Sequence, residues 1–149
     1  MPNKLDIIIV DDEPSACRIV TKMVEKYYVW GDIFSFINVD EAIEYCLNRE
    51  IGVAIFIVDV FLREKSGFDF LDAIEKKFLS ARDDTIIITA HASNDVVNMC
   101  LASEVNFLLE KPIRPHALQF AVRAITTKYL KFAKKLLQDS VFAKSVAGF

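Results

Sequence analysis

Five polar side chains with the capacity for chemistry each follow a run of apolar residues. Asp11 and Asp12 come directly after one such run, Asp59 ends the longest, and Thr89 and Lys111 follow two more. Near-continuous apolar runs are typical of strands buried on both faces of a parallel sheet, and open α/β sheets bind ligands beyond the carboxyl ends of their strands. We therefore expect the five side chains to converge at one edge of a sheet.

The types of these residues favour phosphoryl chemistry. Three neighbouring carboxylates repel one another unless a divalent cation lies among them, and carboxylate oxygens are ligands that suit Mg²⁺. The Lys111 ammonium and the Thr89 hydroxyl suit a phosphoryl group, one as a positive charge and one as a hydrogen-bond donor. Each residue alone is weak evidence, since Asp59 in isolation is equally well explained as a turn cap. Their joint placement predicts a magnesium-dependent phosphoryl site.

The elements that would position these residues alternate regularly along the chain. Apolar spacing in the first two helices predicts that Ile19 and Leu47 point inward. The alternation of elements predicts an α/β fold, in which a doubly wound five-stranded parallel sheet is covered by helices on both faces. We predict strands over residues 5–10, 33–37, 53–59, 85–90 and 105–109, and helices over residues 14–28, 40–47, 67–78, 94–103 and from 115 onward.

Composition and charge exclude several classes of function. Although 53% of the 149 residues are hydrophobic, no apolar run reaches the roughly 18 residues of a membrane span, and the N-terminus lacks the features of a signal peptide. The three widely spaced cysteines suit a reducing cytoplasm. The first 114 residues carry −8 and the residues from Pro115 onward +5. Because arginine and aromatic interleaving is lacking, a solvated lysine-rich helix explains this charge better than a nucleic-acid or acidic partner. We expect a cytoplasmic protein that binds neither membranes nor nucleic acid directly.

The order and types of these motifs resemble the receiver domain of two-component response regulators, the CheY-like superfamily. The resemblance rests on Asp11-Asp12, Asp59, Thr89-Ala90 and Lys111-Pro112, with Gly67 closing the loop after Asp59. It covers residues 4 to about 128 and implies the flavodoxin-like strand order 2-1-3-4-5. It divides the chain into a receiver domain over residues 1–130 and a C-terminal helical extension or truncated linker over residues 131–149.

The resemblance also implies a role for each matching residue. Asp59 would be the phosphoacceptor in a phosphorelay, loaded from a phosphohistidine on a sensor histidine kinase or a histidine phosphotransfer protein. Thr89 would bond a phosphoryl oxygen, Lys111 would pair with the phosphoryl group, and Ala90 would stay small so that the group can enter. The Lys111-Pro112 bond would be cis. Mg²⁺ would be held by Asp11, Asp12, Asp59 and the backbone carbonyl of Phe61. Such a domain is a signalling domain rather than an enzyme, beyond its own aspartyl phosphorylation and dephosphorylation.

Several positions depart from the family pattern. Leu108 stands at the usual switch aromatic, with Phe107 beside it, so a packing shift of the face made by helix four, strand five and helix five is expected in place of a ring flip. Arg63 stands where proline is common, and Glu104 replaces a frequent glycine. Phe61 and His91 lie near the expected phosphoryl group, where their rings are expected to screen water and prolong its lifetime; His91 is equally well explained as a rim residue.

The last predicted helix is longer than a receiver domain needs. Its apolar residues follow a heptad spacing, and the first half of this seam is expected to pack on the sheet. The half past Lys128 either pairs with another chain or continues into an output module. A homodimer is expected to form through this extended helix or through the face made by helix four, strand five and helix five. The seam consists of Leu118, Val122, Ile125, Tyr129, Phe132 and Leu136.

Three other functions compete with that of a phosphoacceptor. A flavodoxin would need a Ser/Thr/Gly-rich phosphate loop where the two adjacent acids stand. A haloacid-dehalogenase-type phosphatase would need a second acid at Phe61. A degenerate receiver, acting only as a phosphorylation-independent interaction module, remains the serious alternative, and Leu108 is its main support.

Overall fold

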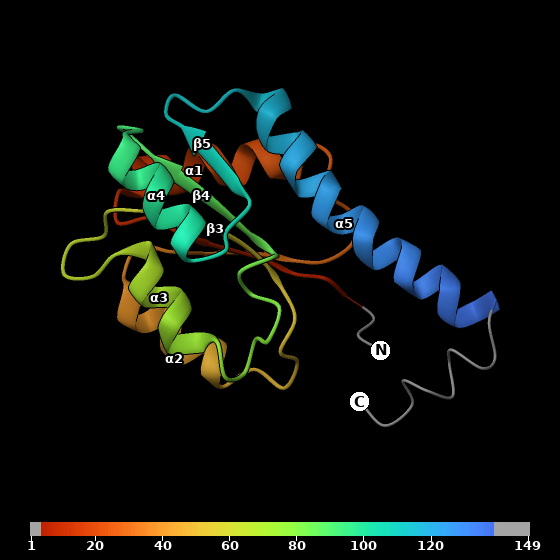
Figure 1. The fold of residues 1–149 in the computed structure, drawn as a ribbon. Coiled ribbons are helices and arrows are strands. Elements are labelled where there is room, and N and C mark those ends of the chain that lie inside the picture. Colours follow the sequence, from red (N-terminus) through yellow and green to blue (C-terminus); the bar gives the residue numbers. More distant parts are fainter. Residues whose placement is uncertain (1–3, 139–149) are drawn as a thin grey trace.

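Five parallel strands form one sheet in the order β2-β1-β3-β4-β5, with five helices connecting them (Figure 1). The computed structural model describes residues 4–138. This order and the parallel pairing confirm the predicted doubly wound fold. The strands are β1 (Ile7–Val10), β2 (Ile33–Phe36), β3 (Ile55–Asp59), β4 (Thr85–Thr89) and β5 (Phe107–Glu110), and the helices are α1 (Pro14–Glu25), α2 (Val39–Leu47), α3 (Gly67–Ile74), α4 (Asn94–Ala102) and α5 (Pro115–Gln138).

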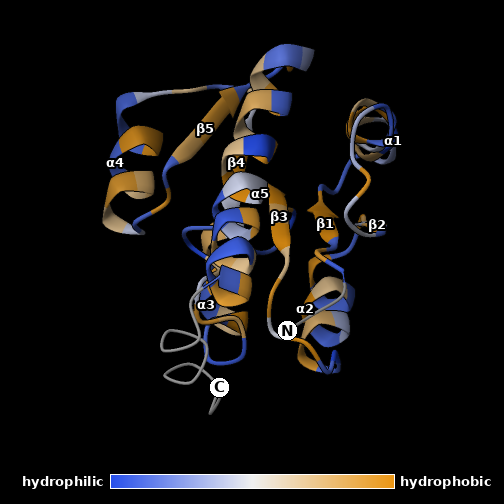
Figure 2. Ribbon diagram, turned by 90° about the vertical axis from the view of Figure 1, so that its right-hand side faces the viewer, coloured by the Kyte–Doolittle hydropathy of each residue, from blue (hydrophilic) through white to orange (hydrophobic). Residues whose placement is uncertain are grey.

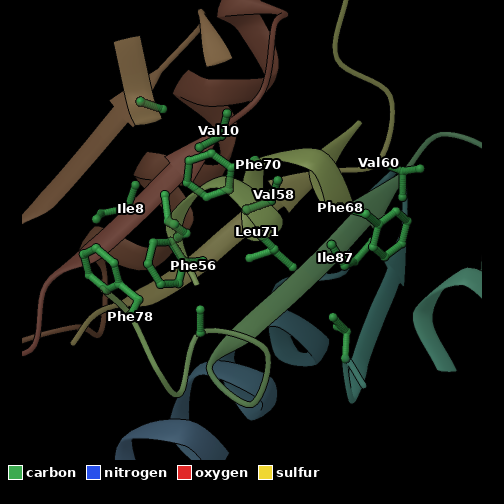
Figure 3. Close-up of a cluster of buried hydrophobic side chains, with 14 of the residues drawn as sticks. Ile8, Val10, Phe56, Val58, Val60, Phe68, Phe70, Leu71, Phe78 and Ile87 are labelled. Carbon is green, nitrogen blue, oxygen red and sulfur yellow. The ribbon is translucent and has the colours of Figure 1, made fainter. Parts of the chain in front are cut away.

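The two faces of the sheet bury separate apolar clusters, because successive residues of a strand point to opposite faces. One cluster lies under α2, α3 and α4 and includes Phe56 and Phe70 (Figure 3). The other lies under α1 and α5 and includes Ile7, Ile57 and Leu118. Colouring by hydropathy shows the central strands as almost uniformly apolar, which is why they read as continuous runs in the sequence (Figure 2).

Two helical residues predicted to face the core lie on the surface instead. Ile19 is 54% exposed and Leu47 is 47% exposed. Helix α1 buries Cys17, Val20 and Val24, which are three and four residues apart, so Ile19 falls at the edge of that stripe. Leu47 is the last residue of α2, where the helix leaves the sheet. The prediction was wrong for both side chains.

Several predicted boundaries differ from the observed ones by a few residues. The largest shift is at α3, which ends at Ile74 rather than at residue 78, and β5 begins at Phe107 rather than at residue 105. Val105 instead closes the end of α4, where its N–H donates to the Cys100 carbonyl (3.0 Å). Glu104, which lies between the end of α4 and Val105, has a φ of +62°. This is a left-handed backbone conformation that residues with a Cβ seldom adopt. This explains why glycine would suit the position.

Helix α5 packs on the sheet with its first half and continues past it (Figure 1). Leu118, Val122 and Ile125 of the predicted seam are buried against β-strands and α1, so this part is not available to a second chain. At the far end of the seam, Phe132 is 42% exposed. The extended last helix and the packing of its first half on the sheet are therefore as expected, and pairing of its second half with another chain stays a prediction. Within residues 4–138, no helix is long and apolar enough to cross a membrane.

Candidate functional site

The predicted chemical residues gather at the carboxyl edge of the sheet. Asp11 directly follows β1, Asp59 ends β3, Thr89 ends β4 and Lys111 directly follows β5. The parallel register brings these ends side by side, with Asp59 opposite Ile88 in the pairing of β3 and β4. The strand ends lie side by side as expected, and the side chains of Asp11, Asp59 and Lys111 are in direct contact.

One ammonium group lies between two buried carboxylates. Lys111 Nζ donates to Asp59 Oδ2 at 2.6 Å and to Asp11 Oδ2 at 2.9 Å. The carboxylates are almost inaccessible to water, with side-chain exposures of 8% for Asp59 and 0% for Asp11. An ion pair this buried is sensitive to the loss of any partner, since the remaining charge cannot be solvated.

Backbone groups fix the second oxygen of each carboxylate. The Phe61 N–H donates to Asp59 Oδ1 at 2.9 Å, and the Glu13 N–H donates to Asp11 Oδ1 at 3.0 Å. The Cys17 thiol also donates to the Asp11 carbonyl at 3.2 Å, and its burial raises its pKa to about 11, so it stays a thiol. The two carboxylates are therefore held in fixed orientations before any ligand arrives.

The charges in this cluster are unequal. Burial raises the pKa of Asp59 above its ordinary value; hydrogen bonds from Lys111 and Phe61 oppose this shift, and repulsion from Asp11 adds to it. Burial lowers the pKa of Lys111, but hydrogen bonds to Asp59 and Asp11 outweigh that effect and raise it overall. The two directions are compatible because one ammonium serves two carboxylates. The cluster thus keeps an excess of negative charge that a further cation would relieve.

Thr89 lies buried beside the loop that follows β4. Its hydroxyl donates to the His91 carbonyl and accepts the His91 N–H, both at 3.3 Å. The Thr89 hydroxyl therefore makes its hydrogen bonds to the neighbouring backbone of His91. The Ala90 and His91 side chains are exposed, and Phe61 is 59% exposed, so the three predicted lining residues lie at the rim. Shielding of the site by the two rings stays a prediction.

The loop after β3 is shaped by close backbone contacts. A Cβ on Gly67 would lie 2.5 Å from the Asp59 carbonyl oxygen, so no larger residue fits there. The Gly67 N–H donates to the Val60 carbonyl at 2.8 Å, and Ser66 caps α3 by accepting the Asp69 N–H. Gly67 therefore holds the loop against the strand that carries Asp59. At the opposite wall, the Lys111-Pro112 peptide bond is cis, as expected.

The two neighbouring residues of β5 face opposite sides of the sheet. Leu108 packs against the cluster under α3 and α4, whereas Phe107 packs against the cluster under α5. Phe107 therefore cannot replace the missing switch aromatic, because its ring lies on the other face. Of Phe107 and Leu108, only Leu108 would therefore be affected by a movement of α4.

One contact at the site was missed by the sequence reasoning. Glu110, the last residue of β5, accepts the Ala92 N–H at 2.7 Å and so ties the loop after β4 to the strand that leads to Lys111. The available signal was an acid directly before the strand-end lysine. Its partner lies 18 residues earlier in the chain and depends on loop geometry.

The donor types fit magnesium. Among residues 4–138, no three acidic, histidine or cysteine side chains form a preassembled metal cluster. Asp11 and Asp59 are nevertheless buried carboxylates that share one ammonium, and Asp12, next in the chain to Asp11, is half-buried. Oxygen donors with an uncompensated negative charge match a hard divalent cation that retains part of its water shell.

Comparison with known proteins identifies the family. The family model of the response regulator receiver domain matches residues 7–123. The chain is 23% identical to the transcriptional regulatory protein CitT of Halalkalibacterium halodurans over 87% of this chain and 55% of that protein. It is also 23% identical to hybrid signal transduction histidine kinase D of Dictyostelium discoideum, over 93% of this chain and 8% of the kinase. The chain spans about half the length of the bacterial relatives it matches.

Solved structures share the fold. The chemotaxis protein CheY4 of Vibrio cholerae superposes with a TM-score of 0.70 at 18% identity, covering 82% of this chain and 98% of that one. A CheY-like receiver domain protein of Methanospirillum hungatei superposes with a TM-score of 0.72 at 18% identity, covering 86% and 98%. With the motif match over most of its length, the chain belongs to the response regulator receiver domain family.

Proposed function

We propose that this receiver accepts a phosphoryl group on Asp59 from a phosphohistidine donor. The observation that supports the proposal most is the buried contact of Lys111 with both Asp59 and Asp11, at 2.6 and 2.9 Å. Family membership supports phosphorylation by a histidine kinase or a phosphotransfer protein. The phosphorylated residue, the requirement for Mg²⁺ and the phosphohistidine donor are each open to experimental test.

In the proposed reaction, an Asp59 carboxylate oxygen attacks phosphorus as the N–P bond of the donor breaks. The imidazole leaves with the electron pair, and an acyl phosphate forms. Lys111 moves its hydrogen bond from Asp59 to a phosphoryl oxygen and keeps its bond to Asp11. In a loose transition state, this positioning and neutralisation is most of what the protein supplies.

Asp11, Asp12, Asp59 and the Phe61 carbonyl would hold Mg²⁺, which when bound supplies positive charge to the phosphoryl oxygens. Thr89 would exchange its bonds to the His91 backbone for one to the phosphoryl group. Because those bonds are long, at 3.3 Å, the exchange gives up little. The movement of Thr89 and the loop tied by Glu110 would then shift α4 against Leu108.

The direct experiment is incubation with acetyl phosphate and Mg²⁺ followed by intact-mass measurement. The wild-type chain should gain the mass of one phosphoryl group, and the gain should disappear with EDTA. Asp59→Asn should gain nothing. An Asp59→Asn variant that is still phosphorylated would remove the assignment of Asp59.

A degenerate, phosphorylation-independent receiver is the competing function, and the leucine at position 108 is the observation that favours it. Titration with Mg²⁺ and beryllofluoride separates the two by nuclear magnetic resonance. A phosphoacceptor should show saturable shifts at the amides of Phe61 and Thr89. A degenerate module should show none.

Three further parts of the assignment are also proposals. We expect a receiver unit over residues 1–130 with an extension over residues 131–149, acting in the cytoplasm without direct nucleic-acid binding. We also expect phosphorylation to change self-association through the face made by α4, β5 and α5. Sedimentation velocity with and without beryllofluoride tests the last expectation.

A further inference from the structure

The part of α5 beyond the sheet begins at a buried anchor. Asp84, at the start of β4, is buried, and its two oxygens accept hydrogen bonds from Lys128 Nζ and the Tyr129 hydroxyl. Lys128 Nζ also lies 4.8 Å from the centre of the Tyr129 ring. These contacts fix the helix where it leaves the sheet. We call residues 130–138 the α5 overhang, and Figure 1 shows it projecting from the body.

The overhang is basic on one side. Over its 24 residues, α5 contains no acidic residue. In the overhang, Lys131, Lys134 and Lys135 are all exposed. At about 100° per residue, these three side chains fall on one arc of the helix. Helices of soluble proteins usually intersperse both signs of charge, so a run of one sign without acids indicates a preference in partners.

The overhang also exposes apolar side chains. Leu130 is 46% exposed, Phe132 is 42% exposed and Leu137 is 89% exposed. Leu130 and Leu137 are seven residues apart and therefore share one face, which borders the lysine arc at Lys134. A helix face that was only solvated would not explain why these leucines are exposed to water. Together the two arcs form an amphipathic surface on a helix that the Asp84 anchor has already oriented.

We propose that the α5 overhang is a docking surface for an acidic amphipathic helix of a partner protein. The partner's apolar residues would cover Leu130 and Leu137, and its carboxylates would face Lys131 and Lys134. A second copy of this helix is a poor occupant, because pairing of residues 130–138 with themselves would bring Lys131 and Lys134 of both copies together, and these residues include no acid. The surface lies at the opposite end of β4 from Thr89, so this proposal is independent of the phosphoryl site.

The experiment measures binding of the full chain to a fluorescent helical peptide with leucine at heptad a and d positions and glutamate at e and g. A second peptide carries lysine in place of each glutamate. Saturable binding of the glutamate peptide, at least tenfold tighter than that of the lysine peptide, is the expected result. The double variant Leu130→Gln, Leu137→Gln should weaken it at least tenfold. The control is Phe120→Gln, which removes an exposed apolar side chain from the sheet-packed half of α5 and should leave binding unchanged.

Four outcomes would overturn the proposal. Binding that survives the double leucine variant is charge attraction alone, and absence of saturable binding removes the surface. Self-association of the wild-type chain that the double variant abolishes makes a second copy the occupant. Leucine-dependent flotation with phosphatidylserine vesicles makes a lipid surface the occupant. Circular dichroism of each variant ensures that the comparison is between folded proteins.

Discussion

At the scale of single residues, the site depends on one ammonium shared by two carboxylates. Lys111 offsets the mutual repulsion of Asp11 and Asp59, which lie too deep for water to do so. Even with this partner, burial keeps the pKa of Asp59 raised. The ionised form of Asp59 therefore disfavours folding at neutral pH, and protonation relieves that effect as the pH falls through the folded-state pKa.

Replacing Lys111 with methionine should greatly increase the destabilisation that the ionised Asp59 carboxylate causes. We expect Lys111→Met to lower the free energy of unfolding by about 3 kcal/mol at neutral pH, because two buried carboxylates are left uncompensated. The deficit should shrink at an acidic pH below the raised folded-state pKa of Asp59, since Asp59 then takes up a proton in the folded variant. Urea unfolding at both pH values measures it. The matched control is Lys65→Met, which breaks an exposed ion pair with Asp40 and should leave stability almost unchanged, because water and salt screen such a pair.

A deficit for Lys111→Met that is equal at both pH values would show that the lysine acts by packing rather than by charge.

The sequence predicted which residues meet but not how each is bonded. Asp11, Asp59, Thr89 and Lys111 follow strands, and the parallel-sheet rule is enough to place them together. The bonds of Thr89 to the His91 backbone, and of Glu110 to Ala92, depend on loop dihedrals that no periodicity encodes. Side-chain exposure at the rim escaped prediction for the same reason.

At the scale of elements, the turn between α4 and β5 contains a residue in an unfavourable backbone conformation. Glu104 adopts the left-handed conformation that ends many helices, usually with glycine. We expect Glu104→Gly to raise the free energy of unfolding by about 0.5–1 kcal/mol, because it relieves the contact between Cβ and the backbone. Glu104→Ala removes the charge but keeps the Cβ and serves as the control. Thermal unfolding of the two variants gives the comparison, and equal melting temperatures would contradict the backbone explanation.

Element interiors were predicted well and element ends were not. Apolar runs identify β1, β3 and β4, since both faces of these strands are buried. The ends of elements depend on capping contacts. Because Val105 closes the end of α4, β5 starts two residues later than predicted. The first half of the heptad seam of α5 packs on the sheet, as expected for the last helix of this fold. Periodicity shows which face is apolar, and only the tertiary structure shows what covers that face.

At the scale of the whole molecule, a second buried polar cluster at the other edge of the sheet ties α5 to the body. Tyr129 donates to the buried carboxylate of Asp84, and hydrogen bonding and burial together raise its pKa far above the ordinary value, burial being the larger cause. We expect Tyr129→Phe to lower the free energy of unfolding by about 1–2 kcal/mol, because one oxygen of Asp84 loses a partner. Hydrogen exchange along α5 should accelerate most near residue 129.

Tyr27→Phe is the matched control for that substitution. The Tyr27 hydroxyl is buried and has no hydrogen-bond partner among the residues that the structure describes. Its removal should be neutral or slightly stabilising, since an unsatisfied polar group is taken out of the interior. If both tyrosine variants lose the same stability in urea unfolding, ring packing rather than the bond to Asp84 explains the anchor.

The central claim, that Asp59 is the phosphoacceptor, is tested most directly by locating the phosphoryl group. The full chain is incubated with acetyl phosphate and Mg²⁺ and reduced with borohydride, which converts an aspartyl phosphate into homoserine. Tandem mass spectrometry of the peptides then locates the change. The account predicts homoserine at position 59 and at no other aspartate. Conversion of Asp11 or Asp12 instead, or of no residue in a folded protein, would contradict it.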